Sequence, residues 1–168
     1  MDFSGNRSLL RCWCDFWILS GSEGLKTGSD FGIEIRVDYL SCNMQDLYLK
    51  KTFNSPEVEF IADTGELTME GRSIPEDPGE FFERLISWIN EYFLSPVERT
   101  VMTIKLEYIN SGSSKYMLEL LRIMKINHDA GKDVQIKWYF EEGDESIEEL
   151  GIHFEQTVQI PFEHIEYY

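Results

Sequence analysis

Apolar residues change their spacing between Thr100 and Met124, and this change predicts a strand followed directly by a helix. In the first part, apolar side chains occupy every second position, at Met102, Ile104, Leu106 and Tyr108. A period of two is typical of a strand with one buried face. In the second part they recur every three or four positions, at Met117, Leu120, Leu121 and Met124. That spacing indicates one face of a helix, so residues 108–115, Tyr-Ile-Asn-Ser-Gly-Ser-Ser-Lys, form the corner between the two elements.

The same patterns predict the other elements of a small α/β domain. Strands are expected at Leu47–Lys51, Val58–Ile61, Glu66–Glu70, Val134–Phe140 and Ile160–Glu166. The turn Asp63-Thr64-Gly65 joins the second and third strands into an antiparallel hairpin. A helix begins at Pro78, behind a capping box of Asp77 and Glu80, and continues to about Leu94. The helix after the corner ends near Gly131, which suits a C-terminal cap, and a last helix is predicted from apolar spacing at Ile147, Leu150, Gly151 and Phe154.

Three strands are thus followed by helix, strand, helix, strand, helix and strand. Strands that alternate with helices favour parallel crossovers. We therefore predict a single α/β domain, with a mixed sheet that begins with an antiparallel hairpin and uses its helices as crossovers.

The helix from Pro78 to Leu94 carries a wider apolar surface than one stripe requires. Burial under the sheet and a neighbouring helix is one explanation, and partial exposure to a partner is the other. Both remain open from the sequence.

Residues 1–43 differ in pattern from the rest of the chain. A short apolar cluster from Leu9 to Leu19 is followed by a Ser- and Gly-rich stretch. We predict a poorly ordered N-terminal extension, with at most a short helix at the cluster, and a domain over residues 44–168 that starts at Met44. A docking tail is the alternative.

Composition excludes several classes of function. The net charge of −16 disfavours nucleic acid and anionic membrane surfaces, and no apolar run is long enough to span a membrane. The cysteines, at positions 12, 14 and 42, lack the spacing of a zinc site, and the acidic turn 141–145 lacks that of a calcium loop. Nucleotide-binding and nucleophile motifs are absent from the sequence. We therefore expect a cytoplasmic binding or regulatory protein, with no cofactor, no metal and no catalytic residues, rather than an enzyme.

The corner serines Ser111, Ser113 and Ser114 lie where the chain enters a helix. Serine is favoured there because its hydroxyl can cap a free N–H of the first turn. The same position can also hold an anion, because free N–H groups and the positive end of the helix dipole meet there. A phosphate on one of these serines is therefore the functional alternative to simple capping.

Three motifs together resemble the SiaC family of bacterial regulatory phosphoproteins. They are Gly-Arg-Ser-Ile-Pro-Glu at 71–76, the corner at 108–115, and Trp-Tyr-Phe at 138–140 followed by acidic residues. The similarity runs from about Leu47 to Tyr167. It implies a fold similar to the anti-sigma-factor antagonists, a STAS-like domain.

The resemblance also implies a function. In that family a Ser/Thr kinase phosphorylates a residue between a strand and a helix, and a PP2C-type phosphatase removes the phosphate. The dephosphorylated form binds and activates a diguanylate cyclase, and so steers cyclic di-GMP signalling and biofilm formation. Carried over, the motif places the acceptor on Ser111, with Ser113 and Ser114 as alternates, and the partner-binding residues at Tyr108, Asn110, Ser111 and Lys115. Serine stands where the family's founding member has threonine.

Three other functions remain open. The chain could be an interaction or scaffold module that is never phosphorylated, or an anti-sigma-factor antagonist in a partner-switching pathway. A small enzyme that uses Glu76 and Asp77, or the acidic turn, is the third.

Overall fold

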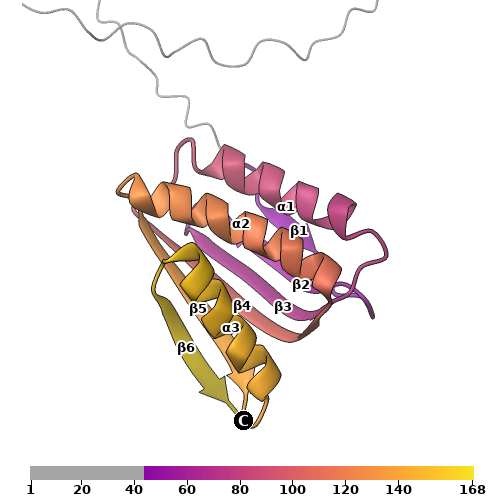
Figure 1. The fold of residues 1–168 in the computed structure, drawn as a ribbon. Coiled ribbons are helices and arrows are strands. Elements are labelled where there is room, and N and C mark those ends of the chain that lie inside the picture. The colour runs from indigo at the N-terminus through magenta and orange to yellow at the C-terminus, as the bar shows by residue number, and fades with distance from the viewer. Residues whose placement is uncertain (1–43) are drawn as a thin grey trace, which may run out of the picture. The chain divides into compact units, whose positions relative to one another are not determined.

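The computed structural model describes residues 44–168, in which six strands and three helices form one α/β domain (Figure 1). In chain order, these are β1 (Leu47–Leu49), β2 (Glu57–Ile61), β3 (Glu66–Ser73), α1 (Pro78–Tyr92), β4 (Arg99–Ile109), α2 (Ser111–Asp129), β5 (Asp133–Glu141), α3 (Glu145–Val158) and β6 (Phe162–Tyr167). The predicted extension 1–43, with its cluster from Leu9 to Leu19 and its three cysteines, lies outside the described residues. The predicted start of the domain at Met44 remains a prediction.

The strands lie in the sheet in the order of the sequence. β1, β2 and β3 pair antiparallel, and β3 to β6 pair parallel. Each of the three crossovers between parallel neighbours contains one helix, and all three helices cover the same face of the sheet (Figure 1). The predicted mixed sheet with an N-terminal hairpin is confirmed.

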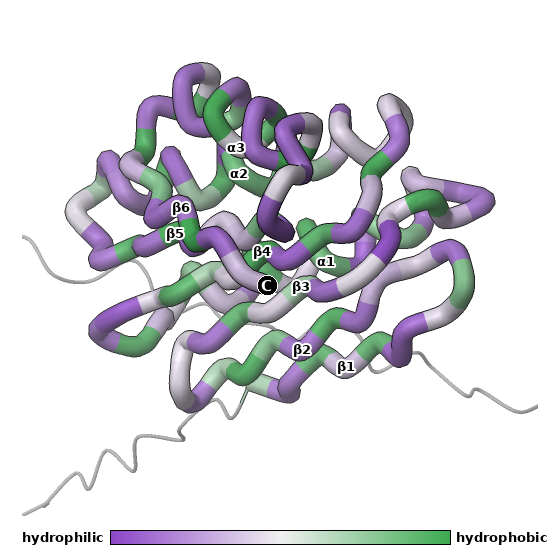
Figure 2. Tube along the Cα trace, turned by 90° about the horizontal axis from the view of Figure 1, so that it is seen from below, coloured by the Kyte–Doolittle hydropathy of each residue, from purple (hydrophilic) through white to green (hydrophobic). Residues whose placement is uncertain are grey.

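The core lies between the sheet and this helical layer. Hydrophobic and hydrophilic residues alternate along the strands (Figure 2), and the inward set is almost fully buried, for example Met102, Ile104 and Ile136. Five residues of α1 are buried as well, and Phe82 stacks on Tyr116 of α2. The first explanation for the wide apolar surface of α1, burial under the sheet and a neighbouring helix, is therefore confirmed. The helix ends at Tyr92 rather than at Leu94.

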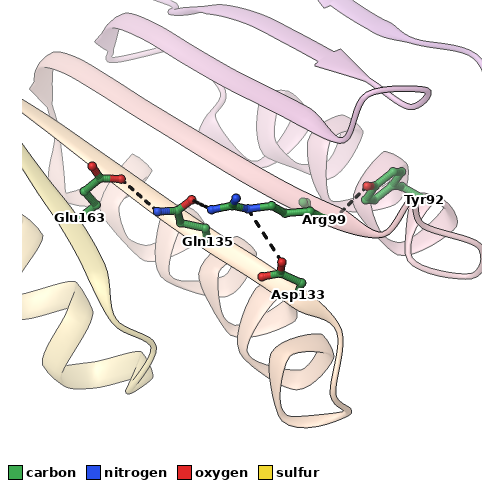
Figure 3. Close-up of polar contacts among 6 residues, drawn as sticks. Tyr92, Arg99, Asp133, Gln135 and Glu163 are labelled. Carbon is green, nitrogen blue, oxygen red and sulfur yellow. Dashed lines mark hydrogen bonds and ion pairs between the residues drawn. The ribbon is translucent and has the colours of Figure 1, made fainter.

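The other face of the sheet carries polar side chains that pair across the strands. Arg99 bridges to Asp133 and donates to Gln135, which in turn donates to Glu163 at 3.0 Å (Figure 3). Each such exposed pair contributes little to stability, but the pairs satisfy polar groups on a face that none of the helices within residues 44–168 covers.

The end of α2 follows the prediction made for Gly131. Gly131 has φ +88° and donates to the carbonyl of His128, and Lys132 donates to that of Asn127. This is the Schellman arrangement, in which glycine takes the left-handed position after the last helical turn.

Candidate functional site

Asn110 holds the corner between β4 and α2 together. Its side-chain Oδ1 accepts from the N–H of Ser113 at 2.7 Å, and its backbone N–H donates to the carbonyl of Ser73 on β3. Its carbonyl accepts from both the N–H and the hydroxyl of Ser114. The expectation that a serine caps this helix is wrong. Asn110 has the extended backbone of an N-cap residue, and its side chain, rather than a serine hydroxyl, accepts from the free N–H of Ser113.

The three serines of the corner differ in their surroundings. Ser111 is exposed, Ser114 is partly buried and donates to Asn110, and Ser113 is fully buried. The hydroxyl of Ser113 has no hydrogen-bond partner within residues 44–168. Ser111 is therefore accessible from solvent without any change in the fold, whereas Ser113 faces the interior.

A β-bulge changes the direction of the last residues of β4. Leu106 lies opposite Gly71 of β3 and Tyr108 lies opposite Arg72, so Glu107 has no partner on β3 and is the extra residue. As a result, Tyr108 leaves the buried face on which its spacing had placed it and is 50% exposed. Ile109 turns toward the core instead. The single-face prediction for Tyr108 is thus wrong, because alternation breaks at a bulge.

Gly71 makes room for the bulge. Its φ of +112° is a conformation that favours glycine, and a Cβ there would lie 2.8 Å from Cε of Lys51. Lys51 crosses this position and donates to Oε1 of Glu107 at 2.7 Å, which raises the pKa of the lysine above its ordinary value.

Two aromatic rings flank the guanidinium of Arg72 on the exposed surface beside the corner. Cζ of Arg72 lies 5.7 Å from the ring centre of Phe53 and 5.9 Å from that of Tyr108. Lys115, one turn into α2, is exposed and lies over the ring of Tyr116.

The predicted partner-binding set therefore falls into two groups. Tyr108, Asn110 and Ser111 follow one another through the corner, and Lys115 lies on α2 one turn beyond Ser111. Sequence reasoning did not predict that Arg72 and Phe53 lie beside Tyr108 on the exposed surface next to the corner. The available signals were a glycine directly before an arginine at the end of a strand, and an aromatic residue in the polar loop Thr-Phe-Asn-Ser.

The start of α1 lies beside the start of α2. A Cβ built on Gly112 would be 3.5 Å from Cγ of Pro78, and one on Gly79 would be 3.0 Å from the hydroxyl of Tyr116. Asp77 caps α1 by accepting from the N–H of Glu80. Capping, rather than paired-carboxylate chemistry, is thus the role that the structure gives Asp77.

The acidic turn 141–145 also has a structural role. Asp144 accepts from the N–H of Ile147 and caps α3. Within residues 44–168, no group of three His, Cys, Asp or Glu side chains is arranged to hold a metal ion. In the same range, none of the helices has the length and apolarity needed to cross a membrane.

Comparison with known proteins gives one consistent result. The family model described as SiaC family regulatory phosphoprotein matches residues 49–167. An uncharacterised protein of Pseudomonas aeruginosa strain UCBPP-PA14 is 31% identical over 120 residues, which are 71% of this chain and 94% of that protein.

Solved structures agree with this result. Apo-SiaC from P. aeruginosa superposes with a TM-score of 0.67 at 26% identity, over 72% of this chain and 98% of that one. The structure of the diguanylate cyclase SiaD in complex with its activator SiaC, from the same organism, matches with a TM-score of 0.69 at 26% identity, over 73% of this chain and 100% of the matched chain.

Proposed function

The chain belongs to the SiaC family of regulatory phosphoproteins, and from this we propose that Ser111 is its phosphorylation site and that phosphorylation switches its binding to an output partner. In the unphosphorylated form it binds and activates a diguanylate cyclase. A Ser/Thr kinase adds the phosphate and a PP2C-type phosphatase removes it. A cytoplasmic location and a role in biofilm or aggregation control are part of the proposal.

The observation that carries the choice of residue is the exposure of Ser111. Of the three hydroxyls at the corner, that of Ser113 is buried and that of Ser114 is engaged by the carbonyl of Asn110. Ser111 also stands in the first turn of α2, directly after the N-cap. Ser111 is thus the corner hydroxyl that a kinase could reach with the start of α2 still folded.

The physical effect of the phosphate follows from its place. It adds about −1.5 to −2 charges at neutral pH, at the N-terminus of α2, where the helix dipole favours negative charge. The modification is therefore compatible with the folded corner. Its consequence falls on whatever docks there, through bulk and through charge.

The choice of output partner rests on the relative. SiaC is the activator of the diguanylate cyclase SiaD, and it shares the fold of this chain. We extend that activity to this protein, with a cyclase of its own cell as the target.

Phosphorylation is tested on the full-length chain purified from its native cell in EDTA, which inhibits metal-dependent phosphatases. We expect the intact mass to show one added phosphate and peptide mapping to place it on Ser111. The phosphate should be lost in Ser111→Ala and kept in Ser114→Ala. A phosphate that persists in Ser111→Ala would refute the assignment.

Output is tested with purified diguanylate cyclases of the same cell, by measuring cyclic di-GMP production. The unphosphorylated chain and Ser111→Ala should activate one of them, and the chain with phosphoserine at position 111 should not. If the unphosphorylated and phosphorylated chains bound the partner equally, the protein would be an interaction module that phosphorylation does not switch. An anti-sigma factor recovered as the phosphorylation-sensitive partner would instead favour the antagonist function.

A further inference from the structure

Phe53, Arg72 and Tyr108 form an exposed cluster, which we call the Arg72 surface. Phe53 is 81% exposed and Tyr108 is 50% exposed, and each ring lies within 6 Å of the Arg72 guanidinium. Arginine and tyrosine are enriched among the residues that dominate binding at protein interfaces.

The cluster is held in place before any partner arrives. The loop that carries Phe53 is closed by hydrogen bonds between Thr52 and Ser55, and the carbonyl of Asn54 accepts from the N–H of Ile74 at 2.8 Å. On β4, the bulge at Glu107 turns the side chain of Tyr108 outward. Bulges commonly redirect a side chain beside a functional site, and a surface fixed in advance loses less entropy on binding.

The charge of Arg72 is not neutralised within residues 44–168. Neighbouring cations are paired, Lys51 with Glu107 and Lys105 with Glu70, but Arg72 has no ion pair in this range. Arg72 therefore presents a positive charge between two exposed rings, in a chain with a net charge of −16. Its N–H groups remain available for bidentate binding of a carboxylate.

We propose that the Arg72 surface docks an acidic segment of the output partner, with a partner carboxylate on Arg72 and an apolar partner side chain against Phe53 and Tyr108. This inference builds on the proposed function and names the chemistry that its partner must present. Charge complementarity to Arg72 is the argument for an acidic segment rather than a basic or purely apolar one.

The position of the surface relative to Ser111 accounts for the switch. Arg72 pairs with Tyr108 on the neighbouring strand, about 5 Å away, and Ser111 is three residues beyond Tyr108, at most about 11 Å along the chain. The Cα atoms of Arg72 and Ser111 are therefore no more than about 16 Å apart, which is within two screening lengths of about 8–10 Å in physiological salt. A phosphate on Ser111, with its charge of about −1.5 to −2, would therefore repel a carboxylate docked at Arg72.

The first test replaces Phe53 by the photoreactive amino acid benzoylphenylalanine in the full-length chain, in its native cell. The control is the same label at Ile126, an exposed apolar residue near the other end of α2. We expect a cross-link from position 53 to a partner segment that contains Asp or Glu, which should weaken when Ser111 is phosphorylated. A cross-linked segment that is basic, a second copy of this chain, or equal cross-linking from position 126 would overturn the proposal.

The second test measures the affinity for the cross-linked partner, purified, by titration. Arg72→Glu should weaken binding about 30-fold or more, as expected for a dominant interface arginine, whereas Arg122→Glu, on an exposed position of α2, should have little effect. Replacing the cross-linked acidic residue of the partner by Arg should restore binding to Arg72→Glu. Phe53→Ser, which changes only an exposed loop side chain, provides a second variant, and unchanged affinity in both Phe53→Ser and Arg72→Glu would refute the inference.

The outcomes separate this inference from the proposed function. If a cyclase is activated in a Ser111-dependent way but Arg72→Glu still binds it, the docking surface is wrong and the switch stands. If Arg72→Glu loses an acidic partner that phosphorylation does not affect, the surface stands and the switch at Ser111 is wrong.

Discussion

The substitution Gly151→Ala, which adds one methyl group, should destabilise this protein, although a change from glycine to alanine usually stabilises a helix. In a helix interior, alanine is normally favoured over glycine by about 1 kcal/mol. Gly151 lies in the middle of α3, where it packs directly against the indole of Trp138. A Cβ on Gly151 would lie 2.5 Å from both Cδ1 and Nε1 of that indole.

The magnitude follows from what the indole holds in place. Trp138 is fully buried, its Nε1 donates to the carbonyl of Ile147 at 2.9 Å, and Phe154 meets the ring edge-on at 5.7 Å. Because neither the helix backbone nor the indole can give way freely, relief of the contact moves α3 outward. Overpacking of this kind costs about 1–3 kcal/mol, and the buried hydrogen bond and the aromatic contact contribute about 1 kcal/mol each. We therefore expect Gly151→Ala to lower the free energy of unfolding by about 1–3 kcal/mol after the gain in helix propensity.

Urea denaturation followed by far-UV circular dichroism measures this change. Gly112→Ala is the matched control, because a Cβ at this helical glycine meets only ordinary contacts at 3.4 and 3.5 Å, and it should be neutral or stabilising. The cost of Gly151→Ala should shrink in a Trp138→Phe background, where the smaller ring leaves space, and a double-mutant cycle measures that coupling. A stabilised Gly151→Ala variant, or a coupling energy of zero, would contradict the packing argument.

Three further changes are tested by the same denaturation measurement. Asn110→Ala should lower the free energy of unfolding by about 1 kcal/mol because the cap of α2 is lost, whereas Asn110→Asp should retain it; an alanine variant as stable as the wild type would contradict the capping role. Gly71→Ala should cost about 1–3 kcal/mol because its φ of +112° strains any other residue, and a neutral effect would show that the bulge does not need this conformation. The N–H of Phe162 and, secondarily, His164 hold the pKa of Glu155 below its ordinary value. Because the pKa is lower in the folded state, the stabilisation is complete above the ordinary glutamate pKa of about 4.3 and is lost as pH falls through the folded pKa. The stability difference between wild type and Glu155→Gln should therefore shrink as the pH is lowered below about 4, and a difference that is independent of pH would exclude this linkage.

The sequence by itself determined the elements and their order, because both depend on local spacing. The period of two in β4 and the three-and-four spacing of α2 are set by apolar residues that must face one core, and each is visible in a short window. Helix ends were predictable where one residue is clearly better suited to the position than its neighbours. Asp77 can accept from a free N–H before α1, and Gly131 can adopt the left-handed conformation after α2.

Only the tertiary structure decided the composition of the candidate site. The corner contains three serines and one asparagine of similar capping ability, and the register between β3 and β4 determines which side chain reaches the free N–H. The packing of α2 onto the rest of the domain buries Ser113 and leaves Ser111 exposed. The same register introduces the bulge at Glu107, which reverses Tyr108 and brings it to Arg72 and Phe53. These contacts join residues that are far apart in the sequence, so no local spacing encodes them. The physical reason is that the register of a sheet and the packed face of a helix depend on contacts between elements, not on the residues of a single element.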